Sequence, residues 1–361
     1  MSDSGSNSGS GFLPYLETFA KGSLATVGTL ATISAGLIYY GQNYLIYPSA
    51  YINVGPDNGV VDSPKDYGLV AEELDMRTSD GINIRAYLLK QCKELPKPIR
   101  FAQLPISPIN YDESETDNDI MARRPTVIMF HGNGGNFGHR IPLGMMFQMF
   151  MRCNVLMVSY RGYGGSEGSP SETGLQIDAQ TALDFVTSDS RLSQTPIILY
   201  GQSIGGAVAI DLASRNPTKI SALILENTFT SLPSLVPHVL PLLGPFTFLC
   251  HQKWDSASKI HLIPHKTPIL LLSGAKDQIV PPEHMTSLRD LVLKRGSKNG
   301  ERNSEERSRW EQFEHGSHND TTAQRGYWNA IEEFLEGLRD KSEFIEFLVW
   351  SLTTYMEDNI I

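Results

Sequence analysis

The fold is decided by the stretch Pro196-Ile-Ile-Leu-Tyr-Gly-Gln-Ser-Ile-Gly-Gly206. Its first part is a short apolar run, which predicts a buried strand over residues 196–201. The residues from Ser203 to Arg215 have the pattern of a helix. Ser203 therefore stands in a tight turn between a strand and a helix, and the glycines around it leave room for that turn. A serine in such a turn is typical of a catalytic nucleophile.

The same alternation of apolar strand and helix continues on both sides of this turn. The other apolar runs that predict strands cover residues 126–131, 154–160, 221–226 and 268–273. Continuous apolar runs indicate parallel strands that are buried on both faces. Before them, residues 70–76 and 82–89 flank Ser79-Asp80-Gly81 and predict an antiparallel hairpin. The sequence predicts an α/β fold with a mostly parallel sheet, helices on both faces and an N-terminal hairpin.

The composition and net charge of the chain argue against some classes of function. The chain has 361 residues, of which 40% are hydrophobic and 19% charged, as in ordinary globular proteins. Its formal net charge of −10 gives a nucleic-acid partner no electrostatic support. Cys92, Cys153 and Cys250 are too widely spaced for a metal-binding pair. We therefore expect no nucleic acid, no metal and no cofactor.

The N-terminal part favours a membrane anchor. Residues 1–21 form a Gly/Ser-rich segment that we interpret as a flexible tail, and no charged residue lies between Lys21 and Asp57. Residues 22–47 are long and apolar enough for one membrane span, and tyrosines gather at the far end, where an aromatic belt belongs. A signal peptide, a mitochondrial presequence and a buried soluble helix are the alternatives. We expect a single-pass protein of the endoplasmic reticulum, another endomembrane or the plasma membrane, with its topology left open.

The rest of the chain divides around one catalytic domain, expected over residues 68–340. Two polar stretches, 92–123 and 296–309, are interpreted as insertions that form mobile loops or lids. Residues 341–361 are interpreted as a C-terminal extension.

A serine hydroxyl needs a base and an acid that orients the base. In a strand–turn–helix site of this kind they follow the nucleophile in the order acid, then histidine. Asp277 follows the strand at 268–273 and is the expected acid, although it could also serve as a turn or N-cap residue, and Glu226 is the alternative carboxylate. For the base, we favour His318 over His315 because it lies in a loop just before a helix.

Two backbone N–H groups are needed to stabilise the oxyanion. One is that of Ile204, directly after the nucleophile at a helix N-terminus. The other is assigned to Asn133, in the glycine-rich loop His131-Gly-Asn-Gly-Gly-Asn136 after the strand at 126–131. A plain tight turn is the alternative interpretation of that loop.

With these motifs in place, the sequence resembles the α/β-hydrolase family, and within it the membrane-anchored branch of fungal Bem-type and mammalian abhydrolase-domain (ABHD-type) proteins. The resemblance rests on Phe130-His-Gly-Asn-Gly-Gly-Asn136, Ser159-Tyr-Arg-Gly-Tyr-Gly-Gly-Ser-Glu-Gly168, Tyr200-Gly-Gln-Ser-Ile-Gly-Gly206, Glu226-Asn-Thr-Phe-Thr-Ser231 and His318-Asn-Asp-Thr321. It implies an α/β-hydrolase fold with a Ser203, Asp277, His318 triad. Some relatives remove palmitoyl groups from proteins, so it also implies that thioesterase activity is plausible.

Related hydrolases carry a short cap, which the resemblance implies over residues 231–260. Its apolar side chains either line an acyl pocket or serve ordinary packing; they are Val236, Leu240, Leu243, Phe246 and Phe248. The expected function is that of a membrane-anchored serine hydrolase that cleaves an ester or thioester of a lipid or acylated substrate. The alternative is a membrane-tethered scaffold that keeps the fold without catalysis, and the oligomeric state is left open.

Overall fold

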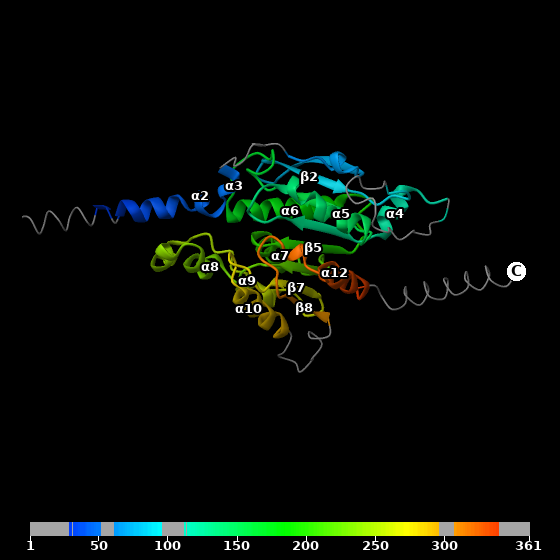
Figure 1. The fold of residues 1–361 in the computed structure, drawn as a ribbon. Helices are drawn as coiled ribbons and strands as arrows, with labels where there is room; N and C mark the ends of the chain where they lie inside the picture. The colour runs from blue at the N-terminus through cyan, green and yellow to red at the C-terminus, as the bar shows by residue number, and fades with distance from the viewer. Residues whose placement is uncertain are drawn as a thin grey trace, which may run out of the picture.

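One sheet organises the protein. The computed structural model describes residues 29–30, 32–51, 61–95, 112, 114–295 and 307–338. In these ranges eight strands form the sheet, in the order β1-β2-β4-β3-β5-β6-β7-β8 (Figure 1). Their bounds are β1 (Ala71–Arg77), β2 (Asn83–Leu89), β3 (Thr126–Phe130), β4 (Asn154–Val158), β5 (Ile197–Gln202), β6 (Ala222–Glu226), β7 (Ile269–Gly274) and β8 (Arg309–Phe313). Strands β1 and β2 form an antiparallel hairpin, β2 pairs antiparallel with β4, and the remaining pairs are parallel. The predicted mostly parallel sheet with an N-terminal hairpin is confirmed.

Helices cover both faces of this sheet. Alternate residues of a strand point to opposite faces, so Val127 packs in one apolar layer and Ile128 in the other. The layer around Val127 contains α5 (Ile141–Met149) and α12 (Tyr327–Glu336). The layer around Ile128 contains α6 (Glu172–Ser188), α7 (Ile204–Arg215) and α10 (Pro282–Leu293). Because strands such as β3 are buried at every position, they are continuously apolar in sequence.

Shorter elements connect these layers and build the cap. The helices are α2 (Gln42–Ile46), α3 (Pro48–Tyr51), α4 (Asp117–Arg123), α8 (Leu232–Val239) and α9 (Ser256–Lys259). The 3₁₀ segments are η1 (Pro64–Tyr67), η2 (Phe137–Arg140), η3 (Pro241–Leu249), η4 (Ile260–Leu262) and η6 (Thr321–Ala323). The expected cap at 231–260 corresponds to α8 and η3, whereas α9 packs against α7.

Two expectations about the insertions are wrong in part. In the stretch 92–123, α4 buries Ile120 and Met121, so its last turns contribute to the core. In the stretch 296–309, Arg309 begins β8 and pairs with Leu270. Residues 96–111, 113 and 296–306 of the two polar stretches lie outside the described residues, as do the expected tail at 1–21 and the extension at 341–361.

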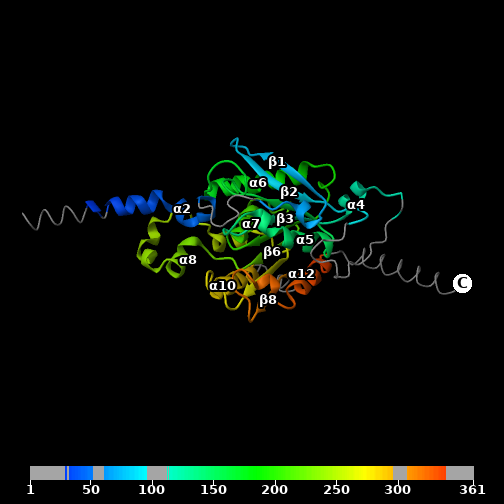
Figure 2. The same cartoon turned by 45° about the horizontal axis from the view of Figure 1, so that its top comes forward.

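The helix of the N-terminal segment is interrupted at Gly41. Residues 32–40 are helical and point away from the sheet in Figure 1, and Figure 2 shows the same after the view is turned. Beyond Gly41, α2 and α3 pack against the catalytic domain, where Gln42 and Tyr47 are buried. Within the described ranges, no helix combines the length and the apolar character that a membrane crossing needs. The end of the expected anchor at residue 47 is therefore too late, because residues 42–47 belong to the folded domain.

The close contact between β5, α7 and β3 leads to a stability prediction. A Cβ at Gly205 of α7 would lie 2.1 Å from the carbonyl oxygen of Phe130, a backbone atom of β3 that cannot rotate away as a flexible side chain can. Gly205→Ala should therefore lower the free energy of unfolding by about 3 kcal/mol or more. Gly134 has nothing within 4 Å of the Cβ position, so Gly134→Ala is the matched control. Urea unfolding of both variants measures this, and equal stability would contradict the steric argument.

Candidate active site

Ser203 occupies a strained turn between β5 and α7. Its backbone angles are φ 55° and ψ −120°, a conformation that L-residues rarely adopt. The turn is possible because glycines surround it: a Cβ at Gly201 would overlap the backbone of Gly205, and one at Gly206 would overlap Thr228. The turn holds the serine at the carboxyl end of the parallel strands, where such sheets form their ligand sites.

Asp277 and His318 are joined directly. The carboxylate Oδ2 of Asp277 lies 2.7 Å from Nδ1 of His318, and both residues are buried. The other carboxylate oxygen accepts backbone N–H groups from Ile279 and Val280, at 2.9 and 2.8 Å. The interpretation of Asp277 as an N-cap is wrong, because α10 begins after Pro281 without a side-chain cap. A carboxylate fixed by two N–H groups in this way holds the imidazole in one orientation.

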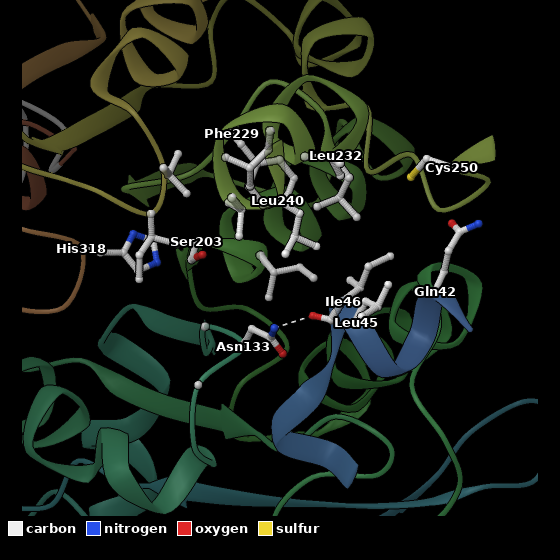
Figure 3. A pocket seen from close by; sticks show the side chains of 18 of the residues that line it. Gln42, Leu45, Ile46, Asn133, Ser203, Phe229, Leu232, Leu240, Cys250 and His318 are labelled. Carbon is white, nitrogen blue, oxygen red and sulfur yellow. Dashed lines mark hydrogen bonds between the residues drawn. The ribbon is translucent and has the colours of Figure 1, made fainter. Parts of the chain in front are cut away.

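The alternative base, His315, is placed differently. It is exposed, and its Nδ1 lies 3.3 Å from Nζ of Lys276. His318, in contrast, lies beside Ser203 at one end of a pocket, as Figure 3 shows. The preference for His318 over His315 thus agrees with the geometry.

Glu226, the alternative acid, is engaged in a separate buried network. Its Oε2 accepts the hydroxyls of Tyr200 and Tyr327, each at 2.5 Å, and its Oε1 accepts Nε2 of Gln202 at 3.1 Å. Burial raises the pKa of this carboxyl group above its usual value, although the hydrogen bonds oppose the shift. Glu226 therefore supports the sheet edge below the site, and Asp277 is the carboxylate that contacts His318.

The two residues after Glu226 support the other members of the site. Asn227 has a positive φ of 45°, and its Nδ2 donates to the carbonyl of His318 and to Oγ1 of Thr321, at 3.3 and 3.0 Å. Thr228 donates its hydroxyl to the carbonyl of Ser203 at 2.6 Å. The motif Glu226-Asn-Thr thereby connects the serine turn to the histidine loop, a role that the sequence alone did not reveal.

The glycine-rich loop is supported from two sides. The hydroxyl of Tyr163 donates to Oδ1 of Asn133 at 2.5 Å, and Nδ2 of Asn133 donates to the carbonyl of Ile46. Tyr160 donates to the carbonyl of His131 at 3.1 Å. The backbone of Asn133 is therefore held next to the pocket that Ile204, the first residue of α7, also lines.

The pocket is apolar and has a volume of about 310 Å³. Val236, Leu240, Leu243 and Phe246 line it, as expected, but Phe248 does not and is 74% exposed. The reason is the 3₁₀ form of η3, in which residues three apart share a face. Positions 240, 243 and 246 follow that spacing, whereas 248 points elsewhere.

Part of the pocket wall comes from a segment that sequence analysis had assigned to the anchor. Ile38, Gln42, Leu45 and Ile46 all line the pocket. Figure 3 shows the last three opposite Ser203 and His318. Nothing local in the sequence indicates this, because the contact joins residues about 160 positions or more from the serine. Phe229, just before the cap, and Leu232 of α8 also line the pocket.

Comparisons with known proteins agree with this fold. A family model described as alpha/beta hydrolase fold matches residues 125–247. The chain is 40% identical over 304 residues to the protein bem46 of Schizosaccharomyces pombe, covering 84% of this chain and 88% of that protein. It is 37% identical to an uncharacterized membrane protein of Saccharomyces cerevisiae, YNL320W, covering 85% and 93% of the two chains. A solved esterase, Pf2001 of Pyrococcus furiosus, has the same fold with a TM-score of 0.56 and 16% identity, over 78% of this chain and 95% of that one.

The fold and the site define an α/β hydrolase. The chain belongs to the α/β-hydrolase family, in the branch that contains bem46.

The buried Glu226 network leads to a prediction about pH. Burial raises the folded-state pKa of Glu226 above its ordinary 4.5, so folding favours the protonated carboxyl. This contribution to stability is complete below about pH 4.5 and is lost as the pH rises through the folded-state pKa. Glu226→Gln keeps an acceptor for both tyrosines but does not titrate. The unfolding free energy of the variant relative to wild type should therefore rise with pH, by at most about 1.4 kcal/mol per unit. Urea unfolding between pH 4 and 8 tests this, and a difference that does not change with pH would contradict it.

Proposed function

We propose that this protein is a membrane-anchored serine hydrolase that cleaves the ester or thioester of an acylated substrate. The observation that carries the proposal is the 2.7 Å contact between Asp277 and His318, made beside the strained Ser203 turn at the end of one pocket. In this assignment Ser203 is the nucleophile, His318 the general base and acid, and Asp277 the residue that orients the base.

The contact with Asp277 also assigns the proton positions. A carboxylate at Nδ1 favours the tautomer with the proton on that nitrogen, which leaves Nε2 of His318 as an acceptor. His318 then takes the Ser203 proton as Oγ attacks the carbonyl carbon and returns it to the leaving alcohol or thiol. In the second half, His318 takes a proton from water and the hydroxide attacks the acyl carbon. The bond between that carbon and Oγ then breaks, His318 returns the proton to Oγ, and the carboxylic acid leaves. Asp277 remains ionised throughout.

The oxyanion is assigned to the backbone N–H groups of Ile204 and Asn133. The first lies at the N-terminus of a twelve-residue helix, whose dipole favours negative charge. The second is that of Asn133 in the glycine-rich loop. Hydrogen bonds with Tyr163 and with the carbonyl of Ile46 fix the Asn133 side chain. Donors that are held in place before the reaction do not need to reorganise as charge develops.

An acyl chain is the substrate feature that suits the pocket. The wall beyond Ser203 is built from aliphatic and aromatic side chains, including Leu232, Leu240, Leu243 and Phe246. Burying a hydrocarbon chain there is favourable in proportion to the area removed from water. Its volume lies at the lower end of the range of small-molecule sites, about 300–1,000 Å³.

Membrane anchoring is supported by the sequence and by one relative. No charged residue occurs between Lys21 and Asp57, and the described helix in this segment exposes Leu30, Ile33 and Leu37. The yeast relative is named as a membrane protein. A protein held at a membrane is close to lipids and acylated proteins, so the proposed anchor fits the proposed acylated substrate.

Covalent labelling tests the catalytic assignment. A fluorophosphonate probe should label the wild type, and Ser203→Ala should abolish labelling because the nucleophile is missing. Asp277→Asn removes the carboxylate that fixes His318 and should slow labelling by about 10³–10⁴-fold. Glu226→Gln is the matched control, because it changes the other buried carboxylate and should label at nearly the wild-type rate. A wild type that resists the probe would favour the non-catalytic scaffold.

The supports of the glycine-rich loop provide a second kinetic test. Tyr163→Phe leaves Oδ1 of Asn133 without its donor and should lower kcat by about tenfold, with KM little changed, because the loss concerns oxyanion geometry. Tyr87→Phe is the control. Tyr87 lies on β2, does not line the pocket, and donates its hydroxyl to the carbonyl of Asp62. Steady-state kinetics with a short water-soluble ester measures both variants. An equal effect of the two substitutions would contradict a specific role for Tyr163.

A further inference from the structure

The mouth of the pocket is formed by two segments that are distant in sequence. Ile38, Leu45 and Ile46 come from the N-terminal segment, and Val239, Leu240 and Phe246 come from the cap. Figures 1 and 2 both place α8 beside the N-terminal helix at the same end of the molecule. Leu45, Val239 and Phe246 are each at least 44% exposed and yet line the pocket, so they lie at its opening.

Polar contacts fix these two segments to each other. Nε2 of Gln42 donates to the carbonyl of Leu249 at 2.8 Å, and the N–H of His251 donates to Oε1 of Gln42 at 3.0 Å. The rings of Tyr39 and His251 lie 4.7 Å apart, centre to centre. The mouth is therefore one continuous surface, although its two sides are about 200 residues apart in the chain.

The outer side of this surface is also apolar. In η3 the face opposite the pocket carries Leu242, which is 89% exposed, and Phe248. Leu37 and Tyr40 are similarly exposed on the N-terminal helix. We call Leu37, Tyr40, Leu242 and Phe248 the outer rim. These four side chains stand on two adjoining segments, and exposed apolar side chains of this kind mark a surface that another apolar phase covers.

Charge favours a bilayer as that phase. The sequence contains no Asp, Glu, Lys or Arg between Lys21 and Asp57, nor between Glu226 and Lys253, and the two uncharged stretches are those that meet at the mouth. The apolar run also continues N-terminally from the exposed helix, in Leu24-Ala-Thr-Val27. Tyr39, Tyr40, Tyr44 and Tyr51 lie in the same region, and tyrosine is enriched at membrane–water interfaces.

We propose that the outer rim is a bilayer-docking surface and that the acyl chain of the substrate passes sideways from the lipid into the pocket. The acyl chain then moves directly from the bilayer interior into the apolar pocket, so it need not cross water on its way to Ser203. Docking is independent of catalysis, whereas the sideways entry rests on the proposed hydrolase function.

Docking is tested with a depth probe on the full chain, reconstituted in phosphatidylcholine vesicles. Leu242→Cys and Phe248→Cys are each labelled with the fluorophore NBD, and Leu262→Cys is the matched control. Leu262 is also largely exposed, but it lies in η4, which packs against α7, α9 and α10 and does not line the pocket. The native Cys92 and Cys153 are buried, and Cys250, which lines the pocket, is replaced by Ser in every variant, so labelling is directed to the introduced thiol.

Lipids that carry a spin label on the acyl chain should quench the fluorophore at 242 and 248 at least about twofold more strongly than at 262, because quenching requires contact with the hydrocarbon. Equal quenching at all three positions would overturn docking. If the NBD fluorescence at 242 and 248 changes with protein concentration but not with lipid, docking would also be overturned. That result would show that a second copy of the chain covers the outer rim.

Sideways entry is tested by turnover of two esters. Leu242→Glu should lower the rate on a long-chain ester dissolved in the vesicles by about tenfold, because a charge in the interface opposes docking. It should leave the rate on a short water-soluble ester within about twofold of wild type, as should Leu262→Glu on both esters. A wild-type rate of Leu242→Glu on the vesicle substrate, or an equal loss on both esters, would overturn sideways entry. If the wild type hydrolyses neither ester, the proposed function fails while the quenching result still decides docking.

Discussion

The steric constraint at the Ser203 turn determines much of the rest of the structure. A serine at φ 55° is unfavourable in isolation, and it persists because β5, α7 and the end of β3 pack without space between them. Side chains at 201 or 205 would separate these elements, and one at 206 would overlap Thr228 after β6. The strain is thus held by the whole sheet, and the result is a hydroxyl fixed at the edge where β3, β5 and β7 also end. Each loop that leaves this edge can then contribute one group to the same small volume.

Hydrogen bonds from outside the proposed triad relate these loops to one another. Asn227 connects the end of β6 to the carbonyl of His318, and its Oδ1 accepts the N–H of Gly274 at 2.8 Å. Tyr163 connects the loop after β4 to Asn133. These contacts are buried in large part, and a buried polar group without a partner is costly, so each loop has few alternative positions. The motifs Ser159–Gly168 and Glu226–Ser231 therefore have a structural explanation, namely that they position Asn133, Ser203 and His318 at the pocket.

The predictions from sequence succeeded where the signal is local. Apolar runs, turn residues and the Gly-rich turns are properties of short stretches, so the sheet, Ser203 and the pairing of Asp277 with His318 could be anticipated. They failed where the outcome depends on a distant partner. Gln42 looks like part of an apolar anchor until its contacts with Leu249 and His251 are known. Ile120 and Met121 lie in an acidic stretch, and only α4 packing on the core makes them buried. Phe248 differs from Phe246 by two positions, which in a 3₁₀ helix is enough to turn it to the opposite side.

The segment from Gln42 to Ser49 joins the expected anchor to the chemistry of the site. The main-chain carbonyl of Ile46 accepts a hydrogen bond from Nδ2 of Asn133. The hydroxyl oxygen of Ser49 accepts one from the N–H of Gly135 at 3.3 Å. Tyr47 is buried between Gln252 and Trp254, with hydrogen bonds of 3.0 and 2.9 Å, which keeps that carbonyl in place. Because the acceptor at Ile46 belongs to the backbone, replacing the Ile46 side chain leaves it intact, whereas a shift of the segment removes it. The position of the glycine-rich loop thus depends on the position of the N-terminal segment, through the carbonyl of Ile46 and the hydroxyl of Ser49.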